Sequence, residues 1–378
     1  MMKYGPVALF TAADWTPTHS SLPGIAVWKH VNVKQQRSGW EQFNKRLWWL
    51  DAYRHPDADW AYAKAGAEAL ATLMQEFQPD CVVLEEVWLY PYLKTLRNFP
   101  ALIIFDNLNV EFSLWEQNFR SVRGIKARSK ARLLLSHLQT IERDLTQKVQ
   151  QIWVCSDEDA VLLHQLYSPL TPIATVPNGI DVSNYAAVRA GQCALPAGLE
   201  SGGPNLLFLG QMSYAPNTVA AHLLLDEIYP RIKQRHPNLR LLLVGRTPTQ
   251  RMKDAAQQDT DIMVTGAVPD VKPYLAASQV MVVPLREGSG TRFKILEAFA
   301  AGCPVISTAK GAEGLKVVDG VHLLIRDDIE DMVSALDTLL ANPALGQKLA
   351  QAAYDLVEQE YSWNAVGMRV NQLISQGS

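Results

Sequence analysis

Short apolar runs recur along the whole chain, each followed by a Gly, Asp or Pro break and a segment of helical length. Apolar runs of four to six residues without alternation are typical of strands buried on both faces of a sheet. This strand–helix alternation predicts parallel α/β sheets in both halves. The predicted strands are 7–10, 81–84, 101–105, 152–155, 173–176, 205–209, 241–244, 261–264, 280–283, 304–307 and 322–325.

The chain has 378 residues, which is more than one ordinary core spans and fits two domains of typical size. Residues 184–203 are rich in Pro, Gly and small side chains and are weakly periodic, which is typical of a linker. We therefore expect one Rossmann-like domain over 1–183 and another over 204–361. A cleft facing the carboxyl ends of their strands is a natural ligand site.

Charge and cysteine content exclude several classes of protein. The 35 Lys and Arg against 38 Asp and Glu give a net charge of -3, which argues against a protein that coats nucleic acid. The sequence has no run of about 20 apolar residues, so no transmembrane helix is predicted. The first apolar run, which ends at Asp14, makes a poor signal peptide. The 4 cysteines form no CxxC pair, which argues against a zinc or dithiol site and favours a reducing compartment.

Two segments leave alternatives open. Residues 40–60 are rich in aromatic side chains, which suit contact with a sugar or lipid acceptor, and the alternative is a helix that buries its aromatics in the N-terminal domain. Residues 126–150 predict one long helix that begins with the basic sequence KARSKAR. That beginning suits an anionic membrane surface, and the alternative is a solvated helix face.

The most informative stretch is 284–315, where a loop containing Gly288 and Gly290 leads into a helix expected to begin near Thr291. Such a loop presents unpaired N–H groups and the positive end of the helix dipole to an anion. Lys294 in the first turn opposes the dipole, so its position makes sense if phosphate binds there. Glu297 lies on the same face and can accept two hydrogen bonds from vicinal hydroxyls. Taken alone, the two residues also fit an ordinary surface pair.

The sequence GTRFKILEAFAAGCPVISTAKGAEGL at 290–315 resembles the donor-site signature of the retaining GT-B glycosyltransferases of family 4, also called glycosyl transferases group 1. Other segments similar to that family follow in the same order, among them VPNGIDVSNY at 176–185, LLFLGQMSYAPNTVAAHLLLDEIYPRI at 206–232 and YSW at 361–363. The resemblance implies a GT-B fold, with two Rossmann-like domains facing across a cleft. It also implies a crossover helix, 362–378, that packs back on the N-terminal domain.

The resemblance further implies that the C-terminal domain binds a nucleotide-diphosphate sugar. Glu297 would hold the ribose hydroxyls, Lys294 would stabilise the leaving diphosphate, and Glu287 would complete the catalytic set. No metal or other cofactor is expected, because fixed positive groups replace the metal and no DxD-type cluster lies in a suitable loop. The implied donor-binding residues are Gly210, Gln211, Gly245, Arg246, Gly266, Ala267, Val268, Ser289, Gly290, Thr291, Arg292 and Leu296.

The donor site departs from the family pattern at two positions. Ser289 stands where a glutamate is usual, and nearby Glu287 is either its substitute or an exposed loop residue. Gln211 stands where an arginine is common, and Arg292 either compensates for that charge or is a solvated residue at the helix start. Arg246 is either a donor contact or a surface residue after a strand.

The N-terminal domain departs further. No segment resembles the family's opening Gly-rich loop, for which SSLPG at 20–24 is a weak candidate, so the first strand–helix unit is either missing or remodelled. Leu108 stands at the position often held by a cleft histidine. The acceptor-side candidates are then Asp106, Asn109 and Glu111, with a helix N-terminal acid as the alternative role for Glu111.

We therefore predict a retaining, metal-independent transferase that moves a hexose-type sugar from a UDP- or GDP-sugar. The acceptor is a glycan, a lipid-linked sugar or a small hydroxyl compound, in surface polysaccharide or glycoconjugate synthesis. The alternative is a catalytically inactive GT-B-like protein that binds a nucleotide or glycan. The predicted location is the cytoplasm, with peripheral contact at the inner membrane face and no nucleic-acid partner.

Overall fold

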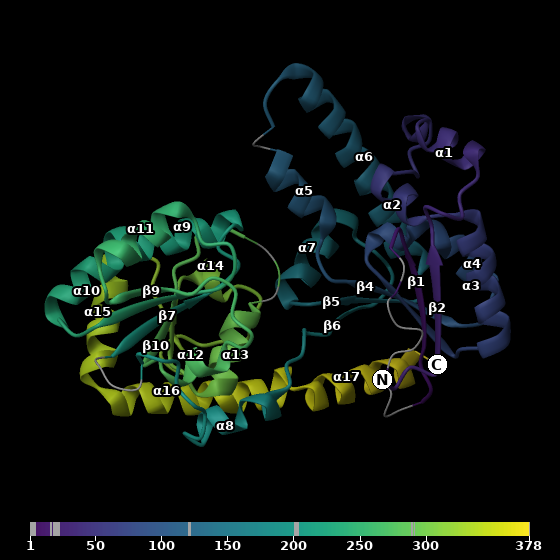
Figure 1. The fold of residues 1–378 in the computed structure, drawn as a ribbon. Coiled ribbons are helices and arrows are strands. Elements are labelled where there is room, and N and C mark those ends of the chain that lie inside the picture. The colour runs from purple at the N-terminus through teal and green to yellow at the C-terminus, as the bar shows by residue number, and fades with distance from the viewer. Residues whose placement is uncertain are drawn as a thin grey trace. The chain divides into compact units, whose positions relative to one another are not determined.

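The computed structural model describes residues 5–15, 17, 23–119, 122–199, 204–288, 290 and 292–377. It divides into two compact units, an N-terminal unit of Met1–Pro177 with Gly367–Ser378 and a C-terminal unit of Asn178–Val366 (Figure 1). Each unit contains a parallel sheet with helices packed against it, and this confirms the predicted α/β class. All the predicted runs overlap strands of the structure.

The boundary between the units differs from the predicted one. It lies after Pro177, and the predicted linker 184–203 belongs to the C-terminal unit. Tyr185, Val188 and Leu199 are buried in the core of that unit. Residues 184–199 therefore pack against the C-terminal unit and do not form a free linker between the two units. At the other end, helix α17, Trp363–Gly377, joins the N-terminal unit from Gly367 onward, where the Gln151 side-chain amide donates to the Leu373 carbonyl at 3.0 Å.

The N-terminal unit is built on a four-stranded parallel sheet of order β3-β4-β5-β6. Its strands are β3 Cys81–Glu85, β4 Leu102–Asn107, β5 Gln151–Val154 and β6 Ile173–Thr175. The helices are α1 Gly39–Lys45, η1 Trp48–Leu50, α2 Pro56–Ala61, α3 Lys64–Phe77, η2 Val87–Tyr92, α4 Leu93–Leu96, α5 Glu111–Phe119, α6 Ile125–Lys148 and α7 Asp157–Tyr167.

The opening of the chain contains a strand pair of its own. Strands β1, Ala8–Ala13, and β2, Val27–Asn32, form a separate parallel pair that is not hydrogen-bonded to the four-stranded sheet. The sequence did not predict β2, because its residues alternate between exposed and less exposed positions. Gly24 of the weak loop candidate 20–24 is described, whereas residues 20–22 lie outside the described part of the chain.

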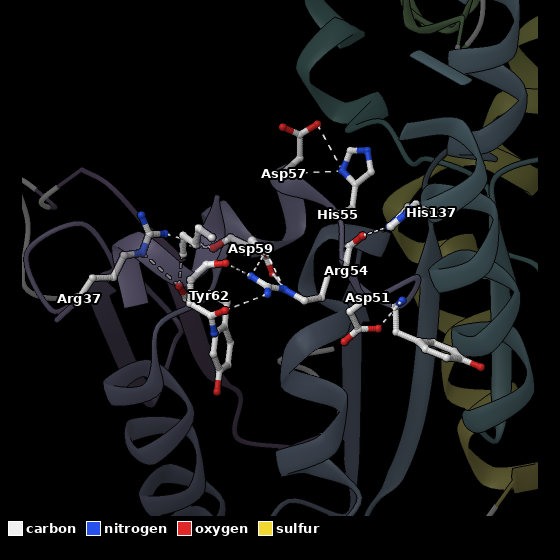
Figure 2. Close-up of polar contacts among 11 residues, drawn as sticks. Arg37, Asp51, Arg54, His55, Asp57, Asp59, Tyr62 and His137 are labelled. Atoms are coloured by element: carbon white, nitrogen blue, oxygen red, sulfur yellow. Dashed lines mark hydrogen bonds and ion pairs between the residues drawn. The ribbon is translucent and has the colours of Figure 1, made fainter. Parts of the chain in front are cut away.

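Residues 40–60 form three short helices and not one helix that buries its aromatic side chains, which was one of the two alternatives. Trp40, Trp49 and Trp60 are exposed, so that alternative was wrong for these three side chains. Figure 2 shows the polar contacts that hold the segment: Arg54 pairs with Asp59 at 2.7 Å, and the His137 ring of α6 donates to the Arg54 carbonyl at 2.8 Å. Hydrogen bonds to the main chain and an ion pair therefore hold this segment, and the rings of Trp40, Trp49 and Trp60 stay exposed.

The C-terminal unit is built on a six-stranded parallel sheet of order β12-β11-β10-β7-β8-β9. Its strands are β7 Asn205–Leu209, β8 Arg240–Val244, β9 Ile262–Val264, β10 Val280–Val283, β11 Val305–Ser307 and β12 Leu324–Ile325. The helices are η3 Val182–Tyr185, α8 Ala186–Arg189, α9 Ala215–Leu223, η4 Leu224–Ile228, α10 Tyr229–Arg235, α11 Gln250–Gln258, α12 Lys272–Ala276, α13 Phe293–Ala301, α14 Ala309–Ala312, α15 Ile329–Ala341, α16 Pro343–Leu356 and η5 Val357–Tyr361. Strands β7 and β10 are buried along their whole length, and β8 is buried except at its first residue, Arg240, as expected of strands covered on both faces.

Candidate functional site

The strand order of the C-terminal sheet fixes where a ligand site belongs. From the central strand β7 the chain proceeds to β8 and β9 on one side, and β10, β11 and β12 then occupy the other side. The direction therefore reverses between β7 and β10, and ligands of open α/β sheets bind at the carboxyl ends of the strands at such a point. Gly210 follows β7, and the loop after β10 leads into α13.

Lys294 is held at this switch point by a contact the sequence did not predict. Its Nζ donates to Oδ1 of Asn217, on α9, at 2.8 Å. The same Nζ lies 4.6 Å from the centre of the Phe208 ring, on β7. A cation placed over an aromatic face and bonded to a neutral amide keeps its positive charge unopposed by a carboxylate contact.

The surroundings of Lys294 make its proton easy to lose. Burial and the neighbouring Arg292 guanidinium lower the pKa of Lys294 to about 7, while Glu297 acts in the opposite direction. A bound anion would favour the charged form and raise this pKa again. The arrangement is therefore typical of a cation that awaits a negatively charged ligand.

Two glycines let the loops after β7 and β8 approach each other. The Gly210 N–H donates to the Val244 carbonyl at 3.1 Å. Gly245 has φ of 145°, and a Cβ there would lie 1.8 Å from the Gly210 oxygen. A Cβ on Gly210 would lie 2.8 Å from the Asn217 amide nitrogen and 3.2 Å from the Lys294 Nζ. Both positions thus require glycine to keep the region around Lys294 open.

Glu297 lies one helical turn beyond Lys294 on α13 and is held by Tyr185. The Tyr185 hydroxyl donates to Oε1 of Glu297 at 3.0 Å. Burial raises the pKa of Glu297, whereas the Tyr185 hydrogen bond and the Lys294 charge act to lower it. This contact orients the carboxylate, and a carboxylate has further acceptor positions on its oxygens for a ligand.

Arg292 is not the solvated residue that the sequence left open as one of two alternatives. Its side chain is buried, and it donates to the carbonyls of Gly288 at 3.1 Å and Lys310 at 2.9 Å. It also pairs with Glu313 at 3.4 Å. Arg292 therefore ties the loop before α13 to α14, while its charge acts on Lys294 through space.

The other predicted donor-binding residues differ in how far they are exposed. Leu296 is 0% exposed in the core, so its side chain cannot reach a ligand and that part of the prediction was wrong. Gly245 and Gly266 form an isolated antiparallel bridge, with Val268 partly buried beside the core. Ser289 and Thr291 lie outside the described residues. The exposed ones are Gln211, Arg246, Ala267, Glu287 and Gly290.

The acceptor-side candidates lie at the carboxyl end of β4 in the N-terminal unit. Asp106 is the last residue but one of β4, Asn109 follows the strand, and Glu111 is the first residue of α5. Burial and the neighbouring Glu85 raise the pKa of Asp106 to about 6. Burial and Glu86 raise the pKa of Glu111 to about 7. Carboxyl groups whose pKa values are about 6 and about 7 are suited to exchange protons with hydroxyl groups near neutral pH.

Three further polar groups of the same unit could not be predicted from the sequence. Glu142 of α6 is fully buried and accepts from the backbone N–H of Glu111 at 2.9 Å, which caps the start of α5. His55 packs between the rings of Trp88 and Trp115, and burial lowers its pKa to about 4, so the ring is neutral. Asn107 is buried, and within the described part of the chain neither atom of its amide has a hydrogen-bond partner. None of these positions carries a local motif.

A groove of about 700 Å³ lies elsewhere in the C-terminal unit. Its lining includes Asp181, Arg189, Glu358 and Trp363, and the Arg189 guanidinium lies 3.2 Å from the centre of the Tyr354 ring. None of the predicted donor residues lines it.

Among the described residues, no group of three or more His, Cys, Asp and Glu side chains is arranged to hold a metal ion. In the same set of residues, no helix combines the length and the apolar character needed to cross a membrane.

Comparison with known proteins gives a family match over the C-terminal unit. Residues 203–342 match the family model described as glycosyl transferases group 1. The chain is 25% identical over 253 residues to a glycogen synthase of Mycobacterium tuberculosis, covering 64% of this chain and 57% of that protein. It is 26% identical over 247 residues to a phosphatidyl-myo-inositol mannosyltransferase of the same organism, covering 63% and 62%. The matches thus span less than two thirds of these relatives.

Solved structures share the fold over most of the chain. A sucrose-phosphate synthase of Thermosynechococcus elongatus aligns with a TM-score of 0.66 at 18% identity, covering 98% of this chain and 88% of that one. The Anabaena protein HepE, in complex with UDP and glucose, aligns with a TM-score of 0.58 at 13% identity, covering 82% and 81%. At these identities the comparison establishes the fold, and it is the fold called GT-B.

Proposed function

We propose that this chain, whose C-terminal unit belongs to the glycosyl transferases group 1 and whose fold is GT-B, transfers a hexose-type sugar from a nucleotide-diphosphate sugar. The observation that carries the proposal is Lys294, a partly buried cation held by Asn217 at the switch point of the sheet. Its neighbours are the beginning of α13 and the oriented carboxylate of Glu297.

Each part of the site has a role in this proposal. The diphosphate lies against the first turn of α13, where backbone N–H groups and the Lys294 charge favour an anion. Glu297 accepts hydrogen bonds from the two ribose hydroxyls, which a carboxylate can do with both oxygens. Gly210 and Gly245 let the main chain approach the phosphates. The known binding of UDP and glucose by HepE supports a UDP-sugar as donor, with a GDP-sugar as the alternative.

The proposed reaction proceeds with retention and without a metal. The bond between the anomeric carbon and the diphosphate oxygen breaks, and a bond to the acceptor oxygen forms on the same face of the sugar. The acceptor proton passes to the leaving diphosphate. Lys294 and the N–H groups of α13 stabilise the charge that develops on that diphosphate, which is the role a metal takes in other transferases.

The proposed acceptor is a glycan, a lipid-linked sugar or a small hydroxyl compound that binds the N-terminal unit near Asp106, Asn109 and Glu111. The names of relatives that elongate glycogen or mannosylate a lipid support an acceptor rich in hydroxyl groups. We propose surface polysaccharide or glycoconjugate synthesis as the process. The cytoplasm is the proposed compartment, since none of the 4 cysteines forms a disulfide.

Calorimetric titration with UDP, GDP, ADP and TDP tests the donor site directly. We expect one nucleotide to bind the wild type tightly, and both Lys294→Ala and Glu297→Ala to weaken it by at least about tenfold, the loss typical of a charged hydrogen bond. Lys253→Ala is the matched control, because this lysine is exposed on α11 and forms no ion pair with any described residue.

Turnover is measured next with the sugar of the nucleotide that binds. Slow hydrolysis or transfer of that sugar is the expected result, and it distinguishes an enzyme from a protein that only binds. If none of the four nucleotides binds, the proposed function is wrong. Binding without any release of sugar would replace it by an inactive GT-B-like binding protein.

A further inference from the structure

The beginning of α6 has a surface that the proposed donor site does not use. Residues 125–133 are exposed except for Ala131, and in Figure 1 this part of the helix extends away from the N-terminal sheet beside α5. Farther along, Leu138, Ile141 and Leu145 are fully buried. The buried half fixes the helix, so its exposed half is formed before any partner arrives.

Positive charge gathers on this exposed half. No acidic residue occurs between Glu116 and Glu142, although the whole chain has a net charge of -3. None of the cations here pairs with a carboxylate of the described residues. The cations are Arg123, Lys126, Arg128, Lys130 and Arg132, and we call this set, with Ile125 and Leu133, the α6 tip.

Two large apolar side chains lie among these charges. Ile125 is 86% exposed and Leu133 is 40% exposed. Eight residues separate them, just over two helical turns, so they share one face of α6. At 100° per residue, Arg128 and Arg132 lie on one flank of that face, and Lys126 and Lys130 lie on the other. Apolar side chains flanked by cations are typical of helices that lie in a membrane interface.

We propose that the α6 tip docks on an anionic phospholipid surface, with Ile125 and Leu133 in the headgroup region and the five cations against lipid phosphates. A solvated face accounts for the cations but leaves the 86% exposure of Ile125 without a function. The charge selects an anionic surface, because each cation near such a surface improves binding about fivefold. Apolar side chains at the centre of the patch favour lipid over a nucleic-acid backbone, which offers only charge there.

The docking proposal is independent of the proposed glycosyl transfer, since it concerns residues outside both candidate sites. It is tested by co-sedimentation of the full-length protein with vesicles of phosphatidylcholine alone or mixed with phosphatidylglycerol. We expect binding to the mixed vesicles only, and a marked decrease at high salt, because salt screens the attraction between exposed charges.

Two variants separate the contributions. Replacing Lys126, Arg128, Lys130 and Arg132 by Gln removes four charges, and we expect vesicle binding to fall by at least about tenfold. Ile125→Ser with Leu133→Ser should weaken binding while the salt dependence stays. The control replaces Lys94, Arg97, Lys253 and Lys348 by Gln, four exposed cations elsewhere, and should bind like the wild type.

Because every substituted side chain is exposed, all three variants should unfold at the wild-type temperature, which a thermal melt verifies. Equal binding to neutral and anionic vesicles, or equal loss in the control variant, would overturn the proposal. So would an α6 tip that binds duplex RNA but no vesicle, because the occupant would then be nucleic acid.

Discussion

The side chains of Lys294 and Asn217 meet at 2.8 Å across the switch point of the C-terminal sheet, although 77 residues separate them in the chain. Asn217 also donates from Nδ2 to the Gln211 carbonyl at 3.0 Å, so its amide has little freedom to turn. It is therefore a positioning residue for the Lys294 ammonium. A neutral acceptor holds the cation in place without neutralising it, which keeps its charge available to a ligand.

Asn217→Ala should weaken binding of the cognate nucleoside diphosphate by roughly tenfold, the loss expected for one hydrogen bond to a charged group. Asn217→Asp is the informative partner variant. It keeps an acceptor for Lys294 but adds a negative charge beside the diphosphate, so we expect weaker binding still. Calorimetry on both variants measures the order, and an Asp variant that binds like the wild type would contradict the assigned role.

The pKa of Lys294, lowered to about 7 by burial and Arg292, predicts a pH dependence of binding. Above pH 7 the free protein has lost this proton, whereas the complex with a diphosphate keeps it. Affinity should therefore fall as pH rises from 6 to 8, and binding near pH 7.5 should take up a proton. Titrations in buffers of different ionisation enthalpy measure that uptake, and Lys294→Arg should abolish it because arginine stays charged.

The same lowered pKa predicts the sign of a stability effect. The folded value lies below the ordinary lysine value of 10.5, so the unfolded chain binds more protons between about pH 7 and pH 10.5. Without ligand, the contribution of Lys294 to the free energy of unfolding should therefore rise with pH across this window. Denaturant unfolding of the wild type and Lys294→Met at several pH values isolates that contribution. A difference between the two that does not change with pH would contradict it.

Gly245→Ala should destabilise the C-terminal unit by at least about 3 kcal/mol, because the new Cβ would lie 1.8 Å from the Gly210 oxygen at a positive φ. Gly320→Ala is the matched control. Gly320 also has a positive φ, of 72°, but its Cβ would meet nothing within 4 Å. We expect only about 1 kcal/mol there. Denaturant unfolding of the two variants compares the steric clash at Gly245 with backbone strain alone at Gly320. Equal losses in the free energy of unfolding would show that the close approach of Gly245 to Gly210 does not matter.

The features that could be predicted are those whose signal is local in the sequence. Continuous apolar runs predicted the strands of both larger sheets, whereas β2, with its alternating exposure, was missed. Gly210, Lys294 and Glu297 were predicted from local motifs and do gather at the same edge of the sheet. Their partners Asn217 and Tyr185 lie 77 and 112 residues away, and no local pattern encodes such contacts.

The assignments that failed depended on the direction of a side chain. Leu296 is between two predicted contact residues in sequence, but a helix directs neighbouring side chains to different faces, and this one enters the core. Of the two alternatives for Arg292, burial excludes the solvated one, and its guanidinium donates to backbone carbonyls. Helix phase could have excluded Leu296, whereas the partners of Arg292 depend on how α14 packs.

Tyr185→Phe tests whether Glu297 recognises a ribose. The substitution removes the hydroxyl that donates to Glu297 at 3.0 Å and leaves the ring in the core. The carboxylate then loses its orienting contact, and its pKa should rise further because the hydrogen bond that lowers it is gone. If Glu297 accepts from the ribose hydroxyls, the wild type should prefer UDP to 2′-deoxy-UDP, or the corresponding pair for another base.

Tyr185→Phe should reduce that preference, and Glu297→Gln should reduce it more, because the amide has only one acceptor oxygen. Tyr214→Phe is the control, since this exposed tyrosine lies near Gly288 and makes no contact with Glu297 among the described residues. Competition calorimetry measures both affinities for each variant. A preference that stays equal in the wild type, Tyr185→Phe and Glu297→Gln would place the ribose elsewhere and leave Lys294 as the sole predicted ligand contact on α13.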